Sequence, residues 1–291
     1  MTQKTQTGFS AEVVKHSSYK GREIITMALE YPRIILAQIN TSRQLAKNTA
    51  SSRAQTTKSL LEQDIFIPEK VGVNKPGMEA TEYLTGKELK RFQKLWVGIY
   101  NKVAKDVQKI QDELNVHKQT TNRLLEVFSF TKSVLTGTKE SWEHLLALRL
   151  EHSTQPEYQL LAQLIDKAIS ESIPQELKVG QWHLPFVDSV EAGEGMINVK
   201  TSVSMCAQTS YRKADDSQEK TDKIYNMLNL VSGSEAPPHI SPTQHQCLAA
   251  DPELHKQQPE FWSEMGGFSN PGFVQYSKIL ENTVLKKKEE K

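Results

Sequence analysis

The sequence predicts an α+β protein with a mixed or antiparallel sheet and long helices. Residues 23–30 alternate between apolar and polar side chains, which is the pattern of a half-buried strand. Residues 88–114 instead repeat apolar side chains every three or four positions, which is the pattern of an amphipathic helix. Strand-like segments return after residue 180. A mixture of strands and long helices is typical of the α+β class.

The first predicted elements are a strand and a helix, with a proline between them. Ile25, Met27 and Leu29 share one face of the strand. Pro32 suits the first turn of a helix because its missing N–H is not needed there. Apolar residues continue a helical pattern to about Asn48, and the small polar residues that follow predict a loop rich in hydroxyl groups.

The middle of the chain predicts an extended connection and then several helices. Residues 67–86 are rich in proline and glycine, which favours an extended segment. The helix at residues 88–114 has the most regular pattern. Two more helices are expected at residues 121–135 and 140–150, and another at 157–170 before a proline.

The character of the sequence changes after these helices. Residues 182–187 and 196–205 resemble strands, with glycines between them as turn residues. Residues 221–231 predict a helix, and residues 232–272 predict mostly loop with short helices. The lysine- and glutamate-rich residues 286–291 predict a solvated end.

The composition is that of a soluble globular protein. Hydrophobic residues make up 37% and charged residues 24% of the 291 residues. The 36 basic and 35 acidic side chains leave a net charge of +1, which gives no reason to expect a nucleic-acid polymer as a partner. No apolar run approaches the ~18 residues that a membrane span needs.

The cysteines and the first residues indicate a reducing compartment. Cys206 and Cys247 are the only cysteines in the sequence, too few for a disulfide framework. Met1–Gly8 is polar and lacks the apolar region of a signal peptide, so we expect a cytosolic protein. A zinc site with His239 and His245 has little support because the usual CxxC and HxxxH spacings do not occur. No metal site is therefore predicted.

The densest cluster of polar side chains spans residues 38–53, with the sequence Q-I-N-T-S-R-Q-L-A-K-N-T-A-S-S-R. It combines arginines, a lysine and small hydroxyl groups at the predicted end of a helix. Bidentate charged donors together with short neutral donors suit a phosphate monoester. The alternative is a solvated helix end followed by a hydroxyl-rich turn.

This cluster resembles the signature R-H-R-x-x-S-x-N-E-x-S-x-R of flavin-dependent thymidylate synthases. Gln38 occupies the position of a glutamine that precedes the family signature, and Arg43, Asn48, Ser51 and Arg53 match signature positions. The remaining signature positions, which are an arginine, a histidine, a serine and a glutamate in the family, are here Thr41, Ser42, Ala46 and Thr49.

Four further segments resemble elements of the same family. Asn122–Leu125 is similar to its A-R-x-x-L-P segment, and Trp142–Gln159 is similar to its F-L-x-L-R-x-x-x-x-A-Q-x-E-I stretch. Cys206–Tyr211 is similar to A-A-R-V-S-Y, and His239–His245 is similar to H-x-S-P-F-E-H. The last two elements precede the signature in the ordinary family but follow it here. The resemblance therefore implies a circularly permuted order, as in the phage-type branch, whose members would act in the host cytoplasm.

The resemblance also implies which residues bind ligands. By resemblance, dUMP is bound by Gln38, Ser51, Arg53, Arg123 and Arg149. Arg149 is also the expected catalytic residue, because its family counterpart helps to activate the uracil ring. The expected FAD contacts are Thr41, Ser42, Arg43, Ser210 and His245.

The expected FAD contacts have lost positive charge relative to the family pattern. Thr41 and Ser42 replace an arginine and a histidine, and Glu140 replaces another arginine. These changes predict weaker binding of the cofactor's diphosphate, by roughly 1.5–3 kcal/mol for each charged hydrogen bond that is lost. Lys47, Lys132 or Lys139 are possible replacement cations.

The activity implied by the resemblance is one-carbon transfer to C5 of dUMP. Methylene-tetrahydrofolate would be the donor, FAD the hydride carrier and NADPH the reductant, in a homotetramer whose active sites are shared between subunits. We expect one domain over residues 1–291, with the signature and a helical part in 1–171 and a strand- and loop-rich part in 172–291.

Three alternatives remain open at the level of the sequence. A related enzyme would transfer a hydroxymethyl group to dUMP or dCMP without reducing a flavin. A catalytically silent relative would keep the nucleotide pocket, or only the fold, as a binding or assembly module. An unrelated α+β protein would require all of the partial motifs to be accidental.

Overall fold

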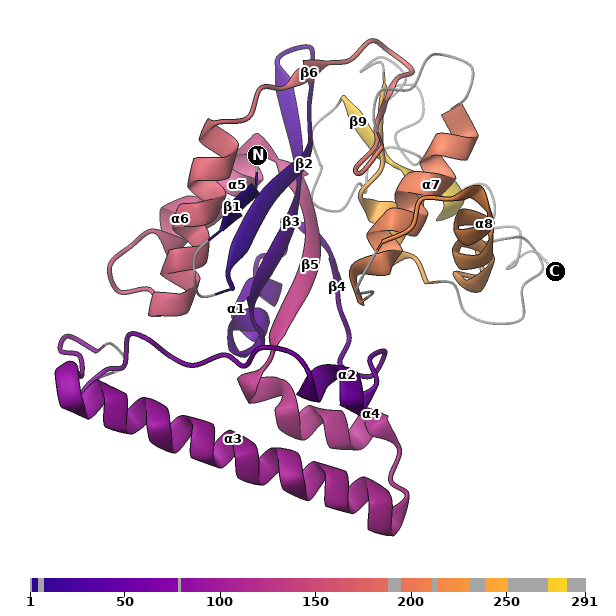
Figure 1. The fold of residues 1–291 in the computed structure, drawn as a ribbon. Helices are drawn as coiled ribbons and strands as arrows, with labels where there is room; N and C mark the ends of the chain where they lie inside the picture. Colours follow the sequence, from indigo (N-terminus) through magenta and orange to yellow (C-terminus); the bar gives the residue numbers. More distant parts are fainter. Residues whose placement is uncertain are drawn as a thin grey trace.

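The computed structural model describes residues 2–4, 8–77, 80–187, 195–210, 214–230, 239–250 and 272–281. Its main feature is a six-stranded sheet in the order β1-β2-β3-β5-β4, with β6 beside β2 (Figure 1). Only the β2–β6 pair is parallel, so the sheet is mixed and the predicted α+β class is confirmed. The strands are β1 (Thr2–Lys4), β2 (Ser10–Tyr19), β3 (Arg22–Pro32), β4 (Ala46–Thr49), β5 (Phe130–Thr138) and β6 (Gln175–Glu176).

The centre of the sheet is the hairpin of β2 and β3, which is extended by β5. Lys20 and Gly21 connect the hairpin with φ values of +48° and +74°. Positive φ at both central residues gives a turn whose twist matches that of the flanking strands. In the pairing of β3 with β5, Thr26 lies opposite Thr136, a register that matters for the site described below.

Two helices cover one face of the sheet. α5 (Lys139–Arg149) and α6 (Pro156–Ser170) lie on the side opposite α7 and α8 (Figure 1). Trp142 is completely buried there, and its Nε1 donates to the Ile25 carbonyl oxygen at 3.1 Å. Burial of such large apolar side chains supplies most of the driving force for folding. The largest buried side chains of this core are Trp142, Tyr31, Tyr158, Ile25, Met27, Ile35, Ile39, Leu135, Leu161 and Ile165.

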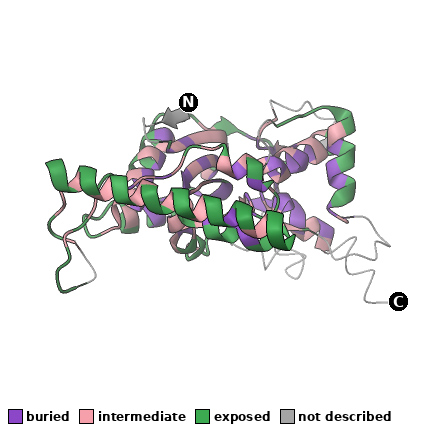
Figure 2. Ribbon diagram, turned by 60° about the horizontal axis from the view of Figure 1, so that its bottom comes forward, coloured by how far each residue is buried: buried purple, intermediate pink, exposed green. Residues whose placement is uncertain are grey.

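The longest helix, α3 (Gly86–Leu114), confirms the predicted helix at residues 88–114. It packs across the end of the sheet through an aromatic group in which Trp96 Nε1 donates to the Phe66 carbonyl oxygen at 2.8 Å. Its opposite face is exposed, including Leu95 at 61% and Ile99 at 55% (Figure 2). Short helices lie beside it: α2 (Thr57–Leu61), α4 (Lys118–Thr121) and the 3-10 helix η2 (Asn122–Phe128).

The C-terminal part forms a smaller layer against the other face of the sheet. Its strands β7 (Trp182–His183), β8 (Cys247–Ala249) and β9 (Phe273–Gln275) make a three-stranded antiparallel sheet. Tyr19 and Ile24 of the main sheet share a buried core with Cys247. The helices of this part are α7 (Gly195–Ala207), η3 (Gln208–Ser210), α8 (Gln218–Met227), η4 (Ser241–Gln244) and α11 (Tyr276–Leu280).

Several predictions of secondary structure are confirmed. The strand at residues 23–30 lies within β3. The helices at residues 140–150, 157–170 and 221–231 correspond to α5, α6 and, in large part, α8. Each of these segments carries a regular apolar face that matches the period of its element.

The helix predicted from Pro32 to about Asn48 is largely wrong. It ends at Asn40, after η1 (Arg33–Ile35) and α1 (Leu36–Asn40), and the chain then enters β4. The Thr41 hydroxyl donates to the Gln38 carbonyl oxygen at 2.6 Å, which helps to close the helix end. The signature residues therefore lie on a short helix, a turn and an edge strand.

Two other segments adopt the opposite structure from the one predicted. Residues 130–135 form part of β5 instead of a helix, because the strand lies between β3 and β4 and is buried on both faces from Ser133 onward. Residues 196–205 form α7 instead of a strand, because Val199, Val203 and Cys206 recur every three or four positions and are all buried. Most of the main sheet therefore lies within residues 1–171, where mainly helices were expected.

Some predictions fall outside the described residues. These are the tail at 286–291 and most of the loop at 232–272. Within the described part of the chain, no helix is long and apolar enough to cross a membrane. The same part contains no cluster of histidine, cysteine and acidic side chains that would hold a metal ion.

Candidate active site

The first group of predicted site residues lies where α1 meets the first turn of α6. The Gln38 amide donates to Gln155 Oε1, and Gln155 Nε2 donates to Glu157 Oε2 at 2.9 Å. The Arg149 guanidinium lies 4.8 Å from the centre of the Tyr158 ring, a cation–π contact that orients it. Gln38 and Arg149, far apart in sequence, are thus held at the same corner of the fold.

Tyr158 is the centre of this corner and was not predicted from the sequence. Its side chain is completely buried, and its hydroxyl makes no hydrogen bond of good geometry with the described residues. Burial raises the pKa of Tyr158, while the nearby Ser42 and Arg149 oppose the rise. The phenol therefore stays protonated and presents a polar group to the space between Ser42 and Arg149.

Lys47 is a second cation beside Arg43 at the turn formed by residues 41–45. Its Nζ donates to the carbonyl oxygens of Leu45, at 3.2 Å, and of Ser42. Burial lowers the pKa of Lys47. Thr41 and Arg43 are exposed on the same turn. The turn thus keeps two cations even though the family's arginine and histidine are absent.

The second group surrounds Glu126, which lies against the loop at the end of the signature. Its Oε1 accepts from Ser52 Oγ at 2.6 Å and from Arg123 Nη1 at 3.1 Å, and it lies 3.9 Å from Arg33 Nη1. Arg33 Nη2 donates to the Ala50 carbonyl oxygen at 2.7 Å. Glu126 and Arg33 therefore hold the loop between residues 50 and 53 against the protein.

Arg33 is a functional candidate that the motif comparison missed. Burial lowers the pKa of its guanidinium, and the Glu126 carboxylate opposes this effect. Arg33 lies in the segment that leads into the signature, but no role was predicted for it from the sequence. In contrast, Arg53 is exposed, and Arg123 is exposed by 57% of its side chain. The backbone N–H of Arg53 donates to Ser51 Oγ at 3.3 Å, so these two predicted phosphate ligands are neighbours.

Asn48 connects the signature to both C-terminal motif segments. Its Nδ2 donates to the Cys206 carbonyl oxygen at 2.7 Å and to Thr209 Oγ1 at 3.4 Å. Its Oδ1 accepts from Ser241 Oγ at 3.1 Å. The side chain of Asn48, which matches the family signature, therefore contacts both η3 and η4. The side chain of Ser210 lies outside the described residues.

His245 is completely buried beside the main sheet. Its Nδ1 lies 2.9 Å from Thr136 Oγ1, whereas its Nε2 has no hydrogen-bond partner among the described residues. Burial lowers the pKa of His245 to about 3, so the imidazole is neutral at physiological pH. His245 Nε2 is thus a neutral ring nitrogen that is covered by the protein and has no partner among the described residues.

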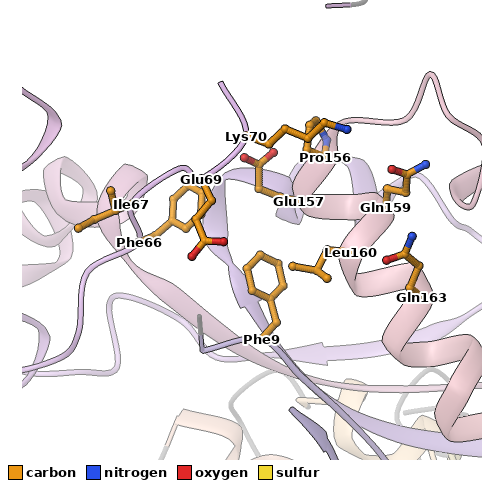
Figure 3. Close-up of a pocket in the computed structure, with 10 residues that line it drawn as sticks. All are labelled: Phe9, Phe66, Ile67, Glu69, Lys70, Pro156, Glu157, Gln159, Leu160 and Gln163. Carbon is orange, nitrogen blue, oxygen red and sulfur yellow. The ribbon is translucent and has the colours of Figure 1, made fainter. Parts of the chain in front are cut away.

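A pocket of about 240 Å³ lies on the outer side of the first turns of α6. Figure 3 shows Phe9 and Leu160 with the Glu157 carboxylate above them, and the Glu69 carboxylate between the Phe66 and Phe9 rings. Glu157 accepts a hydrogen bond from Gln155, which in turn accepts one from Gln38. The sequence predicted no pocket here, because the pocket depends on packing between segments far apart in the chain. Its lining also includes Ile67, Lys70, Pro156, Gln159 and Gln163.

The predicted site residues therefore fall into three groups. Contacts gather Gln38, Ser42 and Arg149 at the first turn of α6; Ser51, Arg53 and Arg123 lie on or near the Glu126-anchored loop; and His245 lies on the face covered by the C-terminal part. The exposed cations are available to a ligand or to another subunit.

A comparison with protein families agrees with the motif resemblance. The family model described as "Thymidylate synthase complementing protein" (Thy1) matches residues 2–175, which is more than half of the 291-residue chain. The match includes the signature, Arg123 and Arg149, and it ends before Ser210 and His245. No curated protein matches the chain.

Proposed function

Because the chain belongs to the family of flavin-dependent thymidylate synthases, we propose that it transfers a one-carbon unit from methylene-tetrahydrofolate to C5 of dUMP. The observation that carries this proposal is the position of Gln38, Ser42 and Arg149 at the first turn of α6. Gln38 is bound to Gln155 there, and Ser42 and Arg149 lie beside Tyr158. These residues come from the signature and from a second family segment. Their proximity is what a shared ligand site requires.

In this proposal Arg149 acts on the uracil ring. A guanidinium held on the Tyr158 ring can donate to a uracil carbonyl oxygen and stabilise the negative charge that develops there. Gln38 helps to place the ring through its own amide. Neither Cys206 nor Cys247 serves as a nucleophile, because both thiols are completely buried and burial raises the pKa of each.

The phosphate of dUMP would be bound by Ser51, Arg53 and Arg123. Exposed guanidinium groups can form paired hydrogen bonds with a phosphate dianion. Arg33 and Glu126 act through the loop, because they fix its backbone and one side chain. In this arrangement Arg123 would exchange part of its contact with Glu126 for the phosphate.

The chain retains residues that fit the ring system of FAD. It has fewer of the family's cations for the diphosphate of FAD. The unpartnered, buried Nε2 of His245 suits a polar atom of a heteroaromatic ring. Arg43 and Lys47 would serve the diphosphate in place of the missing family cations. Thr41 and Ser42 contribute only hydroxyl groups there, and Ser210 keeps its expected role. When bound, FAD would carry hydride from NADPH to the transferred carbon.

We further propose that the chain is a single domain with the permuted order of the phage-type branch. The contacts of Asn48 with Cys206, Thr209 and Ser241 support this order, because they bring the C-terminal motifs to the signature. The core that Tyr19 and Ile24 share with Cys247 supports one folding unit.

The proposed assembly is a homotetramer with shared active sites. The exposure of Arg43, Arg53 and Arg123 in a single chain supports this assembly, because a neighbouring subunit can complete their surroundings. Light scattering coupled to gel filtration would measure the mass. A monomer that nevertheless binds dUMP and turns it over would contradict the proposal of shared sites.

The first experiment is the visible spectrum of the purified protein, before and after addition of FAD and dUMP and gel filtration. A retained flavin band, followed by formation of dTMP from dUMP with methylene-tetrahydrofolate and NADPH, is the expected result. Calorimetry of dUMP binding would compare Arg53→Gln with the matched control Arg91→Gln on exposed α3. Loss of a charged hydrogen bond predicts about 10- to 100-fold weaker binding only for Arg53→Gln.

The losses at Thr41, Ser42 and Glu140 favour two alternative functions. A flavin-free enzyme would make a hydroxymethyl nucleotide from dUMP or dCMP, whereas a silent relative would bind nucleotide without turnover. No flavin retained under any condition would overturn the FAD-dependent reaction. Mass spectrometry of the nucleotide product would then separate the two alternatives.

A further inference from the structure

A continuous chain of hydrogen-bonded side chains crosses the main sheet and ends at His245. Ser17 Oγ lies 2.9 Å from His183 Nδ1, and His183 Nε2 lies 2.8 Å from Thr26 Oγ1. Thr26 Oγ1 lies 2.6 Å from Thr136 Oγ1, which lies 2.9 Å from His245 Nδ1. All five residues are completely buried. They come from β2, β7, β3, β5 and the turn before β8, several of which lie side by side in Figure 1.

Every link in this chain needs one hydrogen atom, and in two of the orientations that satisfy all four links every hydrogen bond points the same way along the chain. In the first, Ser17 donates toward His183, and each following group donates onward until Thr136 donates to His245 Nδ1. His245 then carries its own hydrogen on Nε2. In the second orientation all four hydrogen bonds are reversed, so His245 carries its hydrogen on Nδ1. The two orientations correspond to the two neutral tautomers of His245. In the other orientations Thr26 or Thr136 accepts from both of its neighbours, which leaves its own hydroxyl hydrogen and His245 Nε2 unpaired.

Both histidines are uncharged, which makes this hydrogen count valid. Burial lowers the pKa of His245 to about 3 and lowers the pKa of His183 well below its usual value. The positive charge of Lys15 also lowers the pKa of His183. Each imidazole therefore contributes one hydrogen at neutral pH.

The two orientations differ in what they leave without a partner. The first leaves only the N–H of His245 Nε2 unpaired. The second leaves the hydroxyl hydrogen of Ser17 unpaired and also leaves His245 Nε2 as an unpaired acceptor. A buried polar atom without a partner costs free energy, so the first orientation is the more stable one.

We propose that Ser17 and His183 are remote positioning residues that hold His245 as its Nε2–H tautomer. The Nε2–H of His245 is therefore a buried donor, and a ligand that reached it would need an uncharged acceptor such as a carbonyl oxygen or a ring nitrogen of a heteroaromatic ring. The identification of that ligand as the flavin rests on the proposed function. The tautomer itself does not, because it follows from contacts within the chain.

The test reads the tautomer directly in protein labelled with ¹⁵N-histidine, without any ligand. Long-range ¹H–¹⁵N correlation spectra distinguish a protonated ring nitrogen from an unprotonated one. In the native chain we expect the Nε2–H form of His245 in roughly tenfold excess or more, the ratio that one unsatisfied buried acceptor produces. A predominant Nδ1–H form would overturn the proposal.

Ser17→Ala tests the remote coupling at the far end of the chain. Without that hydroxyl, either orientation leaves one unpaired donor and one unpaired acceptor, so the tautomer ratio of His245 should fall toward one. Thr26→Val cuts the chain between Ser17 and His245, and Ser17→Ala should then have no further effect on the ratio. An unchanged ratio in Ser17→Ala would overturn the proposal.

Two variants guard against a purely structural explanation. Ser133→Ala removes a buried hydroxyl from the same strand, β5, but from a separate network with Tyr31 and Thr49, so it should leave the tautomer unchanged. His183→Gln retains a donor for Thr26 and an acceptor for Ser17, and it should preserve the Nε2–H form.

The tautomer experiment and the flavin experiment can each reject one proposal without rejecting the other. A native chain with the predicted tautomer but no retained flavin would support the proposed positioning and reject the flavin as the ligand. Retained flavin with an Nδ1–H tautomer would reject the positioning while leaving the proposed function intact.

Discussion

The two faces of the main sheet offer different chemistry to a ligand. Around Tyr158 and Glu126, the N-terminal part presents charged groups that are exposed or half-buried, such as Arg123 and Arg149. The C-terminal part contributes His245, which is neutral and completely buried. A dianionic phosphate needs charged and accessible donors, whereas an aromatic ring can use a neutral donor in an apolar setting. Under the proposed function, phosphate binding would fall to the charged side and ring recognition to the neutral side.

The two parts also differ in how much of the core they build. Trp142 is completely buried between α5 and the sheet, while Trp182 of β7 is only half-buried against Tyr276. Trp142→Ala should destabilise the protein by about 3–5 kcal/mol, because a large cavity remains. Trp182→Ala should cost clearly less. Urea unfolding followed by circular dichroism measures both, and equal losses would contradict the unequal division of the core.

Arg149 provides the sharpest functional test of the charged side. Arg149→Gln should lower kcat for dTMP formation by about 10²- to 10³-fold, the loss expected when one donor to a developing oxyanion is removed. Arg91→Gln on α3 is the matched control and should retain full activity. If Arg149→Gln raised only KM, Arg149 would bind the ground state of dUMP without stabilising the transition state.

The neutral side predicts a specific response to acid. The folded-state pKa of His245 is about 3, below its value in the unfolded chain, so the unfolded state binds more protons between these pKa values. The contribution of His245 to the free energy of unfolding is present above pH ~6.5. It is lost as the pH falls toward 3, with a slope of about 1.4 kcal/mol per pH unit.

His245→Gln should remove this one histidine's share of the acid sensitivity. Chemical unfolding between pH 4 and 7 would show a shallower dependence of stability on pH than in the native chain. His152→Gln makes the same substitution at an exposed histidine and serves as the control variant. Equal slopes in the native chain and His245→Gln would show that His245 does not remain neutral in the folded state.

The smallest expected effect concerns the loop that carries Ser51 and Arg53. Glu126→Gln keeps the shape of the side chain but weakens its contacts with Arg33, Arg123 and Ser52. Because two of these contacts are charge-assisted, we expect a loss of about 1–2 kcal/mol in stability and weaker dUMP binding. Thermal unfolding and calorimetry would measure the two effects. Unchanged affinity of Glu126→Gln for dUMP would show that Arg123, once released from residue 126, compensates for the weaker anchoring of the loop between residues 50 and 53.

The family motifs supplied most of the site residues that the sequence predicts. The signature, Arg123 and Arg149 lie within the matched family region, and Gln38 and Arg149 do lie at one corner of the fold. Tyr158, Arg33 and the pocket at Phe9 and Phe66 were missed. These groups owe their positions to packing between distant segments, and no local pattern records such contacts.

The sequence by itself determined the elements whose own residues specify them. The period of apolar residues specifies α3, and the alternation of apolar and polar residues specifies β3, because each pattern reports the geometry of a single element. The strand β5 was mistaken for a helix because a central strand buried on both faces has no such alternation. Its structure is decided by pairing with β3 and β4.

Only the tertiary structure decided the polar chain from Ser17 to His245. Its members come from separate segments, and nothing in the sequence around Thr26 or Thr136 indicates that they face each other across two strands. The register of the sheet sets that contact, and the C-terminal part adds a histidine at each end of the threonine pair. Residue types determine what chemistry is available, whereas tertiary contacts determine which nitrogen of His245 carries the hydrogen.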